Sequence, residues 1–493
     1  MSEPLIFAEH INNKICDFLA NKIVAPLTHE QKIALISPWC RSFTHTTLDW
    51  YLNNKPQHTS QFCPDNAPGD TLAFMRWHKT DDYLHYLSGN HSTDWSCKQI
   101  QTQSELLVLP RFIWAKTIAF QSGIRKKFLT QLTLLSFLKI RKLSYKKKIH
   151  QFSTDTTLRN KILYELIDHL KEYPFAIWLS QKTLEMLPRI FLEGINETYA
   201  NYDKNQSFDA IFSSDCWSSI DSFKIMAFAQ KNRRKVRLIG TPHAFNYSAL
   251  DKFWLRTYEL SFLDKYLSWG ALCDQDPKVI PFYINKFAGY QRSQPIKRVD
   301  EKNPILLTGA MRPNHLVEYP FEPTIFKQYL LDEINIAHIT AQTTKRAVKI
   351  RTRNKDRGGS FEILFREHAP ANVVLDFQSG AFINEVTNYS LHVSDNTSTT
   401  IVESLIVNHP TIIVIANGYF PIDNMASDSF NTLKEVGIFH TTIQSYRIHL
   451  AKINGHMNDW WHDHRTQLAV TNFLNKHARI GGEITIWKNT LLN

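Results

Sequence analysis

The sequence has few of the features that mark several common protein classes. Its six cysteines are scattered over 493 residues and form no C-x-x-C pair. This argues against a disulfide framework or a four-cysteine zinc site and favours a reducing compartment. Neither a G-x-G-x-x-G nor a G-x-x-x-x-G-K-[ST] pattern occurs. The sequence therefore gives little reason to expect a dinucleotide oxidoreductase or a P-loop NTPase.

Long apolar runs are also missing. No window reaches about 18 uninterrupted apolar residues, so no transmembrane helix is predicted. The first residues show no basic segment followed by an apolar one, so we expect no signal peptide and a cytoplasmic protein. With 43% apolar and 21% charged residues, the chain has the composition of a globular protein, and its length predicts two or three domains.

The net charge of +11 arises mostly from one short stretch. Nine basic residues and no acidic one lie between Arg125 and Lys148, around the apolar run FLTQLTLLSFLKI. A helix with this pattern suits peripheral contact with an anionic membrane, and the alternative is a buried helix with solvated basic flanks. Nucleic-acid binding is not favoured, because no recognised binding motif accompanies the charge.

The periodicity of apolar residues predicts an α/β chain with two parallel sheets. The N-terminal run EQKIALISPW fits a strand or a buried turn, and residues 156–201 have helical spacing. Short apolar strands then alternate with helices, first over residues 208–270 and again over residues 303–416. The proline-rich segment 274–303 is interpreted as the connection between the two alternating regions.

This pattern predicts three parts of the chain. Residues 1–285 form an N-terminal Rossmann-like domain with a divergent, partly helical first 150 residues. Residues 286–470 form a second Rossmann-like domain, and residues 471–493 form a tail that packs back on the first. We expect the two sheets to face each other across a cleft.

The strongest local signal is HVSDNTSTTIVESLIVNHPTIIVIA, residues 392–416. A strand runs into small polar residues, and a helix begins near Thr400. The open amides of a helix start bind anions, and in an open α/β sheet this turn lies at the edge where ligands bind. We predict a phosphate site with Ser398, Thr399 and Thr400 as donors. The alternative is an ordinary capped helix.

A second candidate site follows two strands of the first domain. Asp215 and Asp221 lie in FSSDCWSSIDSFK, and His243 lies in GTPHAFNY. A carboxylate and an imidazole at neighbouring strand ends can divide the nucleophilic and proton-transfer roles. Asp215 directly follows its strand and is predicted to be the nucleophile. Asp221 precedes a helix, where an acidic residue also serves as a cap or dipole partner.

Two further groups of charged residues are candidate ligand sites. Arg351 and Arg353 lie on a predicted strand and suit a phosphate or a carboxylate, unless that strand is a solvated edge. Asp274 and Asp276 form a D-x-D pair, but the pair falls in the inter-domain connection and not after a nucleotide-binding strand. We therefore expect no metal and no cofactor other than the substrates.

Four segments within residues 185–445 resemble a group of bacterial surface-polysaccharide transferases. This group includes the retaining β-Kdo glycosyltransferases, which use CMP-Kdo and have a GT-B fold. The segments are FKIMAFAQKN, RLIGTPHAFNYSALDKFWLRTYELSFLDKYLSWG, VSDNTSTTIVESLIVNHPTIIVIANGYF and LKEVGIFHTT. The sequence departs from the group at His243-Ala244-Phe245, where relatives usually read His-Gly-Gly.

The resemblance implies a GT-B-like fold and assigns roles to several residues. The donor nucleotide would lie in the second domain against residues 394–403, which adds Ser394, Asn396, Thr397 and Glu403 to the predicted donor site. The catalytic residues would be a carboxylate after the FSSD strand, His243, and Glu193 in LPRIFLEGINE as support.

These observations favour a cytoplasmic glycosyltransferase that moves Kdo or a related acidic sugar from a CMP-activated donor. The acceptor would be a lipid-linked or oligosaccharide surface glycan, and retention would proceed by double displacement. The alternatives are a UDP- or ADP-sugar transferase of the same fold and an inactive two-domain scaffold.

Overall fold

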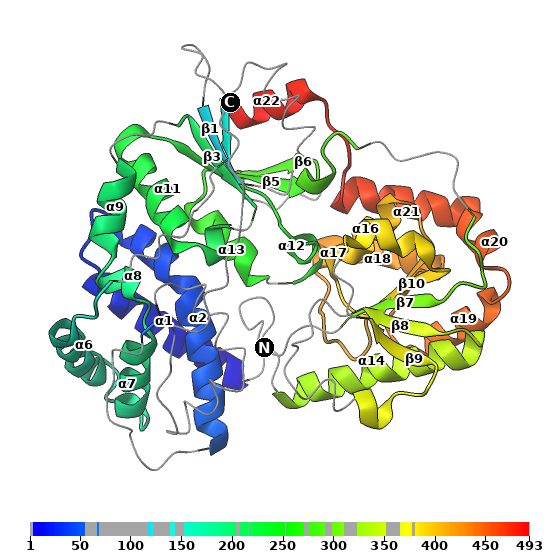
Figure 1. Cartoon of the computed structure of the whole chain (residues 1–493), viewed down its shortest axis with the longest axis horizontal. Helices are drawn as coiled ribbons and strands as arrows, with labels where there is room; N and C mark the ends of the chain where they lie inside the picture. The colour runs from blue at the N-terminus through cyan, green and yellow to red at the C-terminus, as the bar shows by residue number, and fades with distance from the viewer. Residues whose placement is uncertain are drawn as a thin grey trace.

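The computed structural model shows two α/β units side by side, each built on a parallel sheet (Figure 1). It describes residues 3–54, 67–68, 117–121, 139–142, 152–203, 208–214, 216–251, 253–270, 276–290, 298–309, 323–351, 365–376 and 380–492.

The first sheet has six strands in the order β2-β1-β3-β4-β5-β6, and every neighbouring pair is parallel. The strands are β1 (Thr117–Gln121), β2 (Lys139–Lys142), β3 (Ala210–Ser213), β4 (Arg237–Gly240), β5 (Lys265–Trp269) and β6 (Val279–Phe282). Strands β3 and β4 are short and almost wholly buried, as the apolar runs predicted. The expected connection at 274–303 needs correction, because residues 279–282 form strand β6 beside β5.

The second sheet also has six parallel strands, in the order β12-β11-β10-β7-β8-β9. They are β7 (Ile305–Thr308), β8 (Val348–Arg351), β9 (Val373–Asp376), β10 (Leu391–Ser394), β11 (Thr411–Val414) and β12 (Phe439–His440). Read from β9 to β12, this is the 3-2-1-4-5-6 order of the Rossmann fold. The two parallel sheets confirm the predicted α/β, GT-B-like class of two Rossmann-like units.

Helices surround both sheets (Figure 1). In the first unit they are α1 (Glu3–Lys22), α2 (His29–Asn54), α6 (Thr156–His169), α7 (Ala176–Met186), α8 (Arg189–Leu192), α9 (Ile195–Asp203), α10 (Cys216–Ser219), α11 (Asp221–Arg234), α12 (Asn246–Ala249), α13 (Trp254–Phe262) and the short η3 (Asn285–Phe287). Around the second sheet they are α14 (Pro323–Thr344), α16 (Phe382–Glu385), η4 (Val386–Asn388), α17 (Thr399–Ile406), α18 (Asn424–Glu435), α19 (Ile443–Ile453), α20 (Met457–His462) and α21 (His464–His477). The final helix, α22 (Ile484–Leu492), buries Trp487 and Leu491 in one cluster with residues of β3, β4, β5 and β6.

The N-terminal run EQKIALISPW is helical, so its prediction as a strand or buried turn was wrong. It lies in α2, where Ile36, Trp39, Cys40 and Phe43 are completely buried. These positions recur every three or four residues, which is the spacing of one helix face. The ten-residue window was too short to show this period, and Pro38 inside the helix obscured it further.

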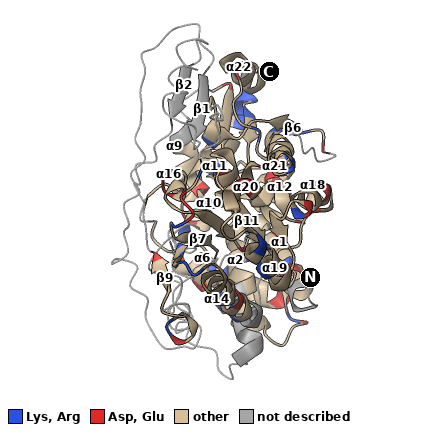
Figure 2. Cartoon of the chain, turned by 90° about the vertical axis from the view of Figure 1, so that its right-hand side faces the viewer, with Lys and Arg blue, Asp and Glu red and all other residues tan. Residues whose placement is uncertain are grey.

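The basic stretch 125–148 is not a single helix. Residues 139–142 form strand β2, which pairs in parallel with β1 at the edge of the first sheet, and the rest of the stretch lies outside the described residues. Among the described residues, no helix is both long enough and apolar enough to cross a bilayer. Figure 2 shows basic and acidic residues interspersed on the described ribbon. Membrane contact by this stretch stays a prediction.

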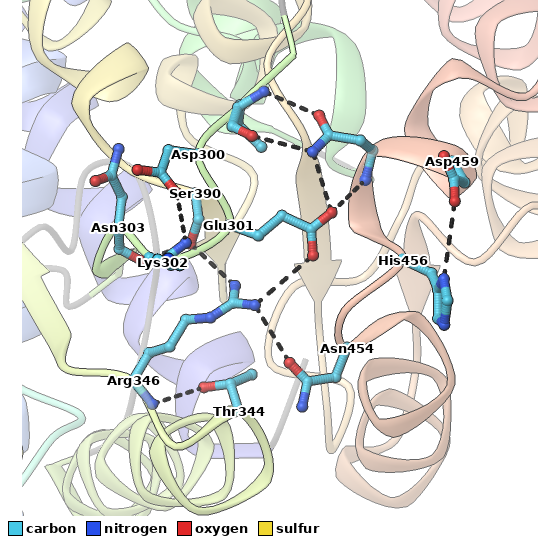
Figure 3. Close-up of polar contacts among 12 residues, drawn as sticks. Asp300, Glu301, Lys302, Asn303, Thr344, Arg346, Ser390, Asn454, His456 and Asp459 are labelled. Carbon is cyan, nitrogen blue, oxygen red and sulfur yellow. Dashed lines mark hydrogen bonds and ion pairs between the residues drawn. The ribbon is translucent and has the colours of Figure 1, made fainter.

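A polar network centred on Glu301, which precedes β7, joins the ends of α14 and α19 and the start of α20 (Figure 3). Arg346, just after α14, donates to Asn454 Oδ1 at 3.3 Å and lies 3.8 Å from Glu301 Oε2. Asn458 of α20 donates its backbone N–H and its Nδ2–H to Glu301 Oε1, each at 3.0 Å. Because Glu301 precedes β7, this network fixes the amino edge of the second sheet.

The two units contact each other through residues 249–251 of the first and residues 421–423 of the second. Leu250 and Ile422 form an antiparallel bridge, and Asp423 N–H donates to the Ala249 carbonyl at 2.9 Å. Arg256 pairs with Asp423 at 3.0 Å, and both side chains are largely buried. The contact is therefore a bonded interface between the units.

Replacing Asp423 with Asn is expected to lower the free energy of unfolding by about 1–3 kcal/mol. Asn keeps the capping bond that Asp423 accepts from Met425 N–H, so the change isolates the charge that faces Arg256. Denaturant unfolding measures the effect. The control is Asp459→Asn, whose pair with Arg298 is 3.7 Å long and exposed and is expected to contribute almost nothing. Equal stability of the two variants would contradict the interface.

Candidate functional site

The turn between β10 and α17 lies where the strand order of the second sheet reverses. Strand β10 pairs with β7 in parallel, with Ser394 opposite Thr308 at the carboxyl ends. Ligands of open α/β sheets bind at this reversal point, outside the carboxyl ends of the strands. The structure therefore places the predicted donor-binding turn at the position where this fold binds ligands.

The turn is rigid because its side chains bond to its own backbone and to neighbouring elements. Asn396 Oδ1 accepts from Ser398 N–H at 2.9 Å, and Ser394 donates to the Asn396 carbonyl at 3.1 Å. Asp395 accepts from the Tyr329 hydroxyl at 2.7 Å. Its carboxylate also fills the space where a side chain on Gly309 would begin, since a Cβ there would lie 2.2 Å from Oδ1. Glycine at 309 is thus required by this packing.

Four side chains form a continuous hydrogen-bonded chain from the sheet interior to the start of α17. His392 Nε2 lies 2.7 Å from Thr308 Oγ1, which lies 3.1 Å from Thr400 Oγ1. Thr400 Oγ1 lies 2.6 Å from Ser398 Oγ. Ser398 is the N-cap residue of α17 and makes no side-chain capping bond. Its hydroxyl is therefore held by Thr400 at the helix N-terminus.

Two buried histidines beneath this turn are neutral. Burial holds the pKa of His392 well below its ordinary value, and the nearby positive charge of Arg351 lowers this pKa further. Burial also lowers the pKa of His409 to about 3. Both side chains lie in the interior, His392 with no exposed surface and His409 with 3%.

The free energy of unfolding is expected to fall as the pH drops below about 6.5. The unfolded chain binds protons at His392 and His409 near that pH, whereas the folded chain binds them only at much lower pH, so acid favours unfolding. Each histidine contributes about 1.4 kcal/mol per pH unit in this window. Denaturant melts at pH 7 and pH 5 measure the loss. His409→Gln should reduce the pH dependence, whereas replacement of the exposed His456 by Gln should leave it unchanged.

The β4–α12 loop carries the second predicted group. His243 is half-buried, and its Nδ1 lies 3.2 Å from the hydroxyl of Tyr247 in α12. The Tyr247 hydroxyl donates to Glu259 Oε1 of α13 at 2.8 Å, and the Glu259 side chain is completely buried. His243 therefore begins a polar chain that runs into the interior of the first unit.

Direct hydrogen bonds join this loop to the β10–α17 turn, and Figure 1 shows α12 and α17 together in the middle of the molecule. Thr397 donates to Asn246 Oδ1 at 2.8 Å, and Phe245 N–H donates to Thr399 Oγ1 at 3.3 Å. The Phe245 ring packs against Phe473 of the second unit at a centroid distance of 5.7 Å. The structure thus brings His243's loop and the predicted donor turn into contact.

Glu403 and Lys286 form another link between the units. Glu403 of α17 has a buried side chain, and it pairs with Lys286 of η3, whose side chain is 48% exposed. The predicted donor-site residue Glu403, in the middle of α17, therefore forms an ion pair with a lysine of the first unit.

Two predicted catalytic carboxylates are engaged in buried ion pairs. Glu193 accepts two bonds from Arg159, at 2.7 and 2.9 Å. It is the C-cap residue of α8, a helix on the left of Figure 1. Asp221 is the first residue of α11 and lies 3.3 Å from Lys224 Nζ, with both side chains fully buried. These contacts give Glu193 and Asp221 structural roles. Asp221 lies in the first turn of α11, where its charge suits a dipole partner, but the N-cap is Ile220. The catalytic roles of both residues stay predictions.

Of the remaining predicted residues, the structure describes Arg351 and Asp276. Arg351 at the end of β8 pairs with Glu385 at 2.8 Å and donates to the Gly380 carbonyl. Asp276 Oδ1 accepts from Lys278 N–H at 2.8 Å, as in a turn. Asp215, Arg353 and Asp274 lie outside the described residues, although β3 ends at Ser213, in register with Gly240 of β4. Within the described ranges, no three His, Cys, Asp or Glu side chains gather as metal ligands do.

Sequence reasoning missed the residues that connect the two predicted groups. Asn246 accepts a hydrogen bond from Thr397, and Tyr247 bonds to both His243 and Glu259. None of these residues lies in a recognisable sequence motif. Tyr247 lies four residues after His243, and this helical spacing is the one signal in the sequence that could have indicated the pair.

Several solved structures are similar to this chain. They include TarM (14% identity, TM-score 0.39, 61% of this chain and 58% of that chain) and glycosyltransferase VinC in complex with DTDP (9%, 0.37, 76% and 98%). Glycosyltransferase SnogD from Streptomyces nogalater is also similar (8%, 0.37, 77% and 99%). At these TM-scores the fold assignment rests on the strand order above. No curated protein matches.

A family model describes nearly the whole chain. The model of the LIC12162 family transferases matches residues 28–491, which include both sheets and the joined loops. The chain therefore belongs to the LIC12162 family of transferases.

Proposed function

We propose that this transferase is a glycosyltransferase that moves Kdo or a related acidic sugar from a CMP-activated donor to a bacterial surface glycan. One observation carries the proposal most strongly: hydrogen bonds join the His243 loop of the first unit to the β10–α17 turn of the second. A transferase needs its catalytic group and its donor phosphate side by side, and this junction would bring the two together. The resemblance of the four sequence segments to CMP-Kdo enzymes supports the donor class.

In the proposed reaction, the β10–α17 turn binds the donor phosphate. The first-turn amides of α17 and the Ser398 hydroxyl would donate to the phosphate oxygens, which stabilises the leaving nucleotide without a metal ion. Asp215 would attack the anomeric carbon, CMP would leave, and the acceptor hydroxyl would then displace Asp215. His243 would transfer a proton or face the phosphate.

The acceptor side of the proposal comes from the sequence. A lipid-linked or oligosaccharide acceptor fits the polysaccharide transferases that the sequence resembles. Contact of residues 125–148 with the anionic inner face of the cytoplasmic membrane would bring the enzyme to a lipid-linked acceptor.

A thermal-shift panel of CMP, UDP and ADP tests the donor class. A ligand that binds the folded chain at 100 times its Kd stabilises it by about 2.7 kcal/mol, so the proposal expects a clear rise in Tm with CMP alone. A rise with UDP or ADP instead would indicate a transferase with another donor. No rise with any of the three would favour the inactive scaffold.

A further inference from the structure

The direction of the hydrogen bonds around Tyr247 determines how His243 is held. Tyr247 has one hydroxyl proton, and it donates that proton to Glu259 Oε1 at 2.8 Å. The Tyr247 oxygen can then only accept at its 3.2 Å contact with His243 Nδ1. The His243 ring must therefore carry its proton on Nδ1, which leaves Nε2 as the nitrogen able to accept a proton or to act on a ligand.

The surroundings keep this chain fixed. Glu259 is completely buried, and Arg256 of the same helix donates to the Tyr247 carbonyl at 3.2 Å. Tyr258 and Tyr266, which flank Glu259 from α13 and β5, stay protonated, because burial and then the charge of Glu259 raise the pKa of each well above its ordinary value. Arg256 itself pairs with Asp423 across the interface. Glu259 Oε1 is thus the acceptor of the Tyr247 hydroxyl proton.

We propose that Tyr247 and Glu259 are positioning residues that fix the tautomer and orientation of His243 for its action on the donor. The buried carboxylate polarises Tyr247, and Tyr247 in turn favours a proton on Nδ1 of the imidazole. Nε2 is then the ring nitrogen that acts on the donor. The His243 loop contacts the donor turn through Thr397 and Thr399. This inference rests on the proposed function for the identity of the donor, but the orientation of the ring does not depend on it.

Diethylpyrocarbonate, which modifies unprotonated imidazole, tests the orientation without any substrate. The rate of modification of His243 is followed by peptide mass spectrometry as a function of pH in the wild type and in Tyr247→Phe. Loss of the Tyr247 oxygen removes the partner that favours the protonated ring, so the acidic limb of the profile should move to lower pH. Glu259→Gln, which keeps an acceptor oxygen but loses the charge, should give a smaller shift.

Tyr266→Phe is the matched control. Tyr266 is buried on β5 and its ring stacks with that of Tyr247 at 6.2 Å, yet its hydroxyl has no hydrogen-bond partner among the described residues. This variant should keep the wild-type profile and the wild-type activity. In a transfer assay with a CMP-sugar, Tyr247→Phe should lower kcat/KM about tenfold and shift its pH profile in the same direction as the modification profile.

The outcomes separate the two proposals. If folded Tyr247→Phe keeps the wild-type modification profile while CMP protects His243 from modification, the positioning role is wrong and the donor site stands. If the profile shifts but CMP neither protects His243 nor supports transfer, the positioning role holds and the proposed function fails.

Discussion

Replacing Asp215 with Asn is expected to abolish sugar transfer while leaving CMP binding and the fold intact. Asn has the size of Asp but cannot form the covalent glycosyl intermediate that double displacement requires. Intact-mass measurement of the wild type with donor alone should show a sugar adduct, and the variant should show none. Asp209→Asn is the control, because Asp209 is exposed and lies before β3, at the opposite end of the strand from Ser213.

The ion pairs of the other two candidate carboxylates, Glu193 and Asp221, make this prediction more specific. Glu193 is held by Arg159 and Asp221 lies beside Lys224, both in buried pairs, so neither is expected to carry an adduct. An adduct mapped to either residue, or an active Asp215→Asn, would show that the nucleophile is wrongly assigned.

Replacing Ser398 with Ala is expected to weaken CMP binding about tenfold or more. A hydrogen bond to a charged group contributes about 1.5–3 kcal/mol, and Ser398 is the hydroxyl at the start of α17. Calorimetric titration of CMP measures the change. The variant should fold normally, because Ser398 makes no side-chain capping bond.

Thr442→Ala is the control, because it should lower stability without changing CMP affinity. Thr442 is the N-cap of α19 and its hydroxyl accepts from Ser445 N–H, so this variant loses a capping bond worth about 1 kcal/mol of stability. It should nevertheless keep wild-type CMP affinity, since α19 is not at the donor turn. If Ser398→Ala binds CMP as tightly as the wild type, the hydroxyl has no role in phosphate binding.

Much of the fold was predictable because short buried strands have simple sequence signals. Strands β3, β4, β10 and β11 are short, largely apolar runs, and each was predicted close to its observed position. Helix α2 was not predicted, because the run EQKIALISPW covers only part of it, and the buried Cys40 and Phe43 that continue its apolar face lie beyond that run.

The candidate site was predictable only as separate pieces. The hydroxyl-rich turn and His243 stood out locally, since each follows a strand. Their junction depends on Thr397 bonding to Asn246 and on Phe245 packing against Phe473, and such contacts between distant segments leave no pattern in one sequence. The same reason explains why the ion pair of Glu193 was not predicted: its partner Arg159 lies on another helix, α6.

Phe245 also gives a physical meaning to the departure from the His-Gly-Gly pattern. Its ring lies among Phe430, Phe473 and His477 of the second unit. Glycine offers no side chain to fill that space, so in this chain the residue after Ala244 joins the units by packing as well as by its backbone N–H.

A crystal structure of the chain with CMP bound tests the central claim most directly, because the claim is that one donor site lies where the His243 loop meets the β10–α17 turn. The account predicts the CMP phosphate at the N-terminus of α17, within hydrogen-bond distance of Ser398 and on the side of the turn that faces His243. CMP bound elsewhere in the chain, with this junction unchanged and unoccupied, would contradict it.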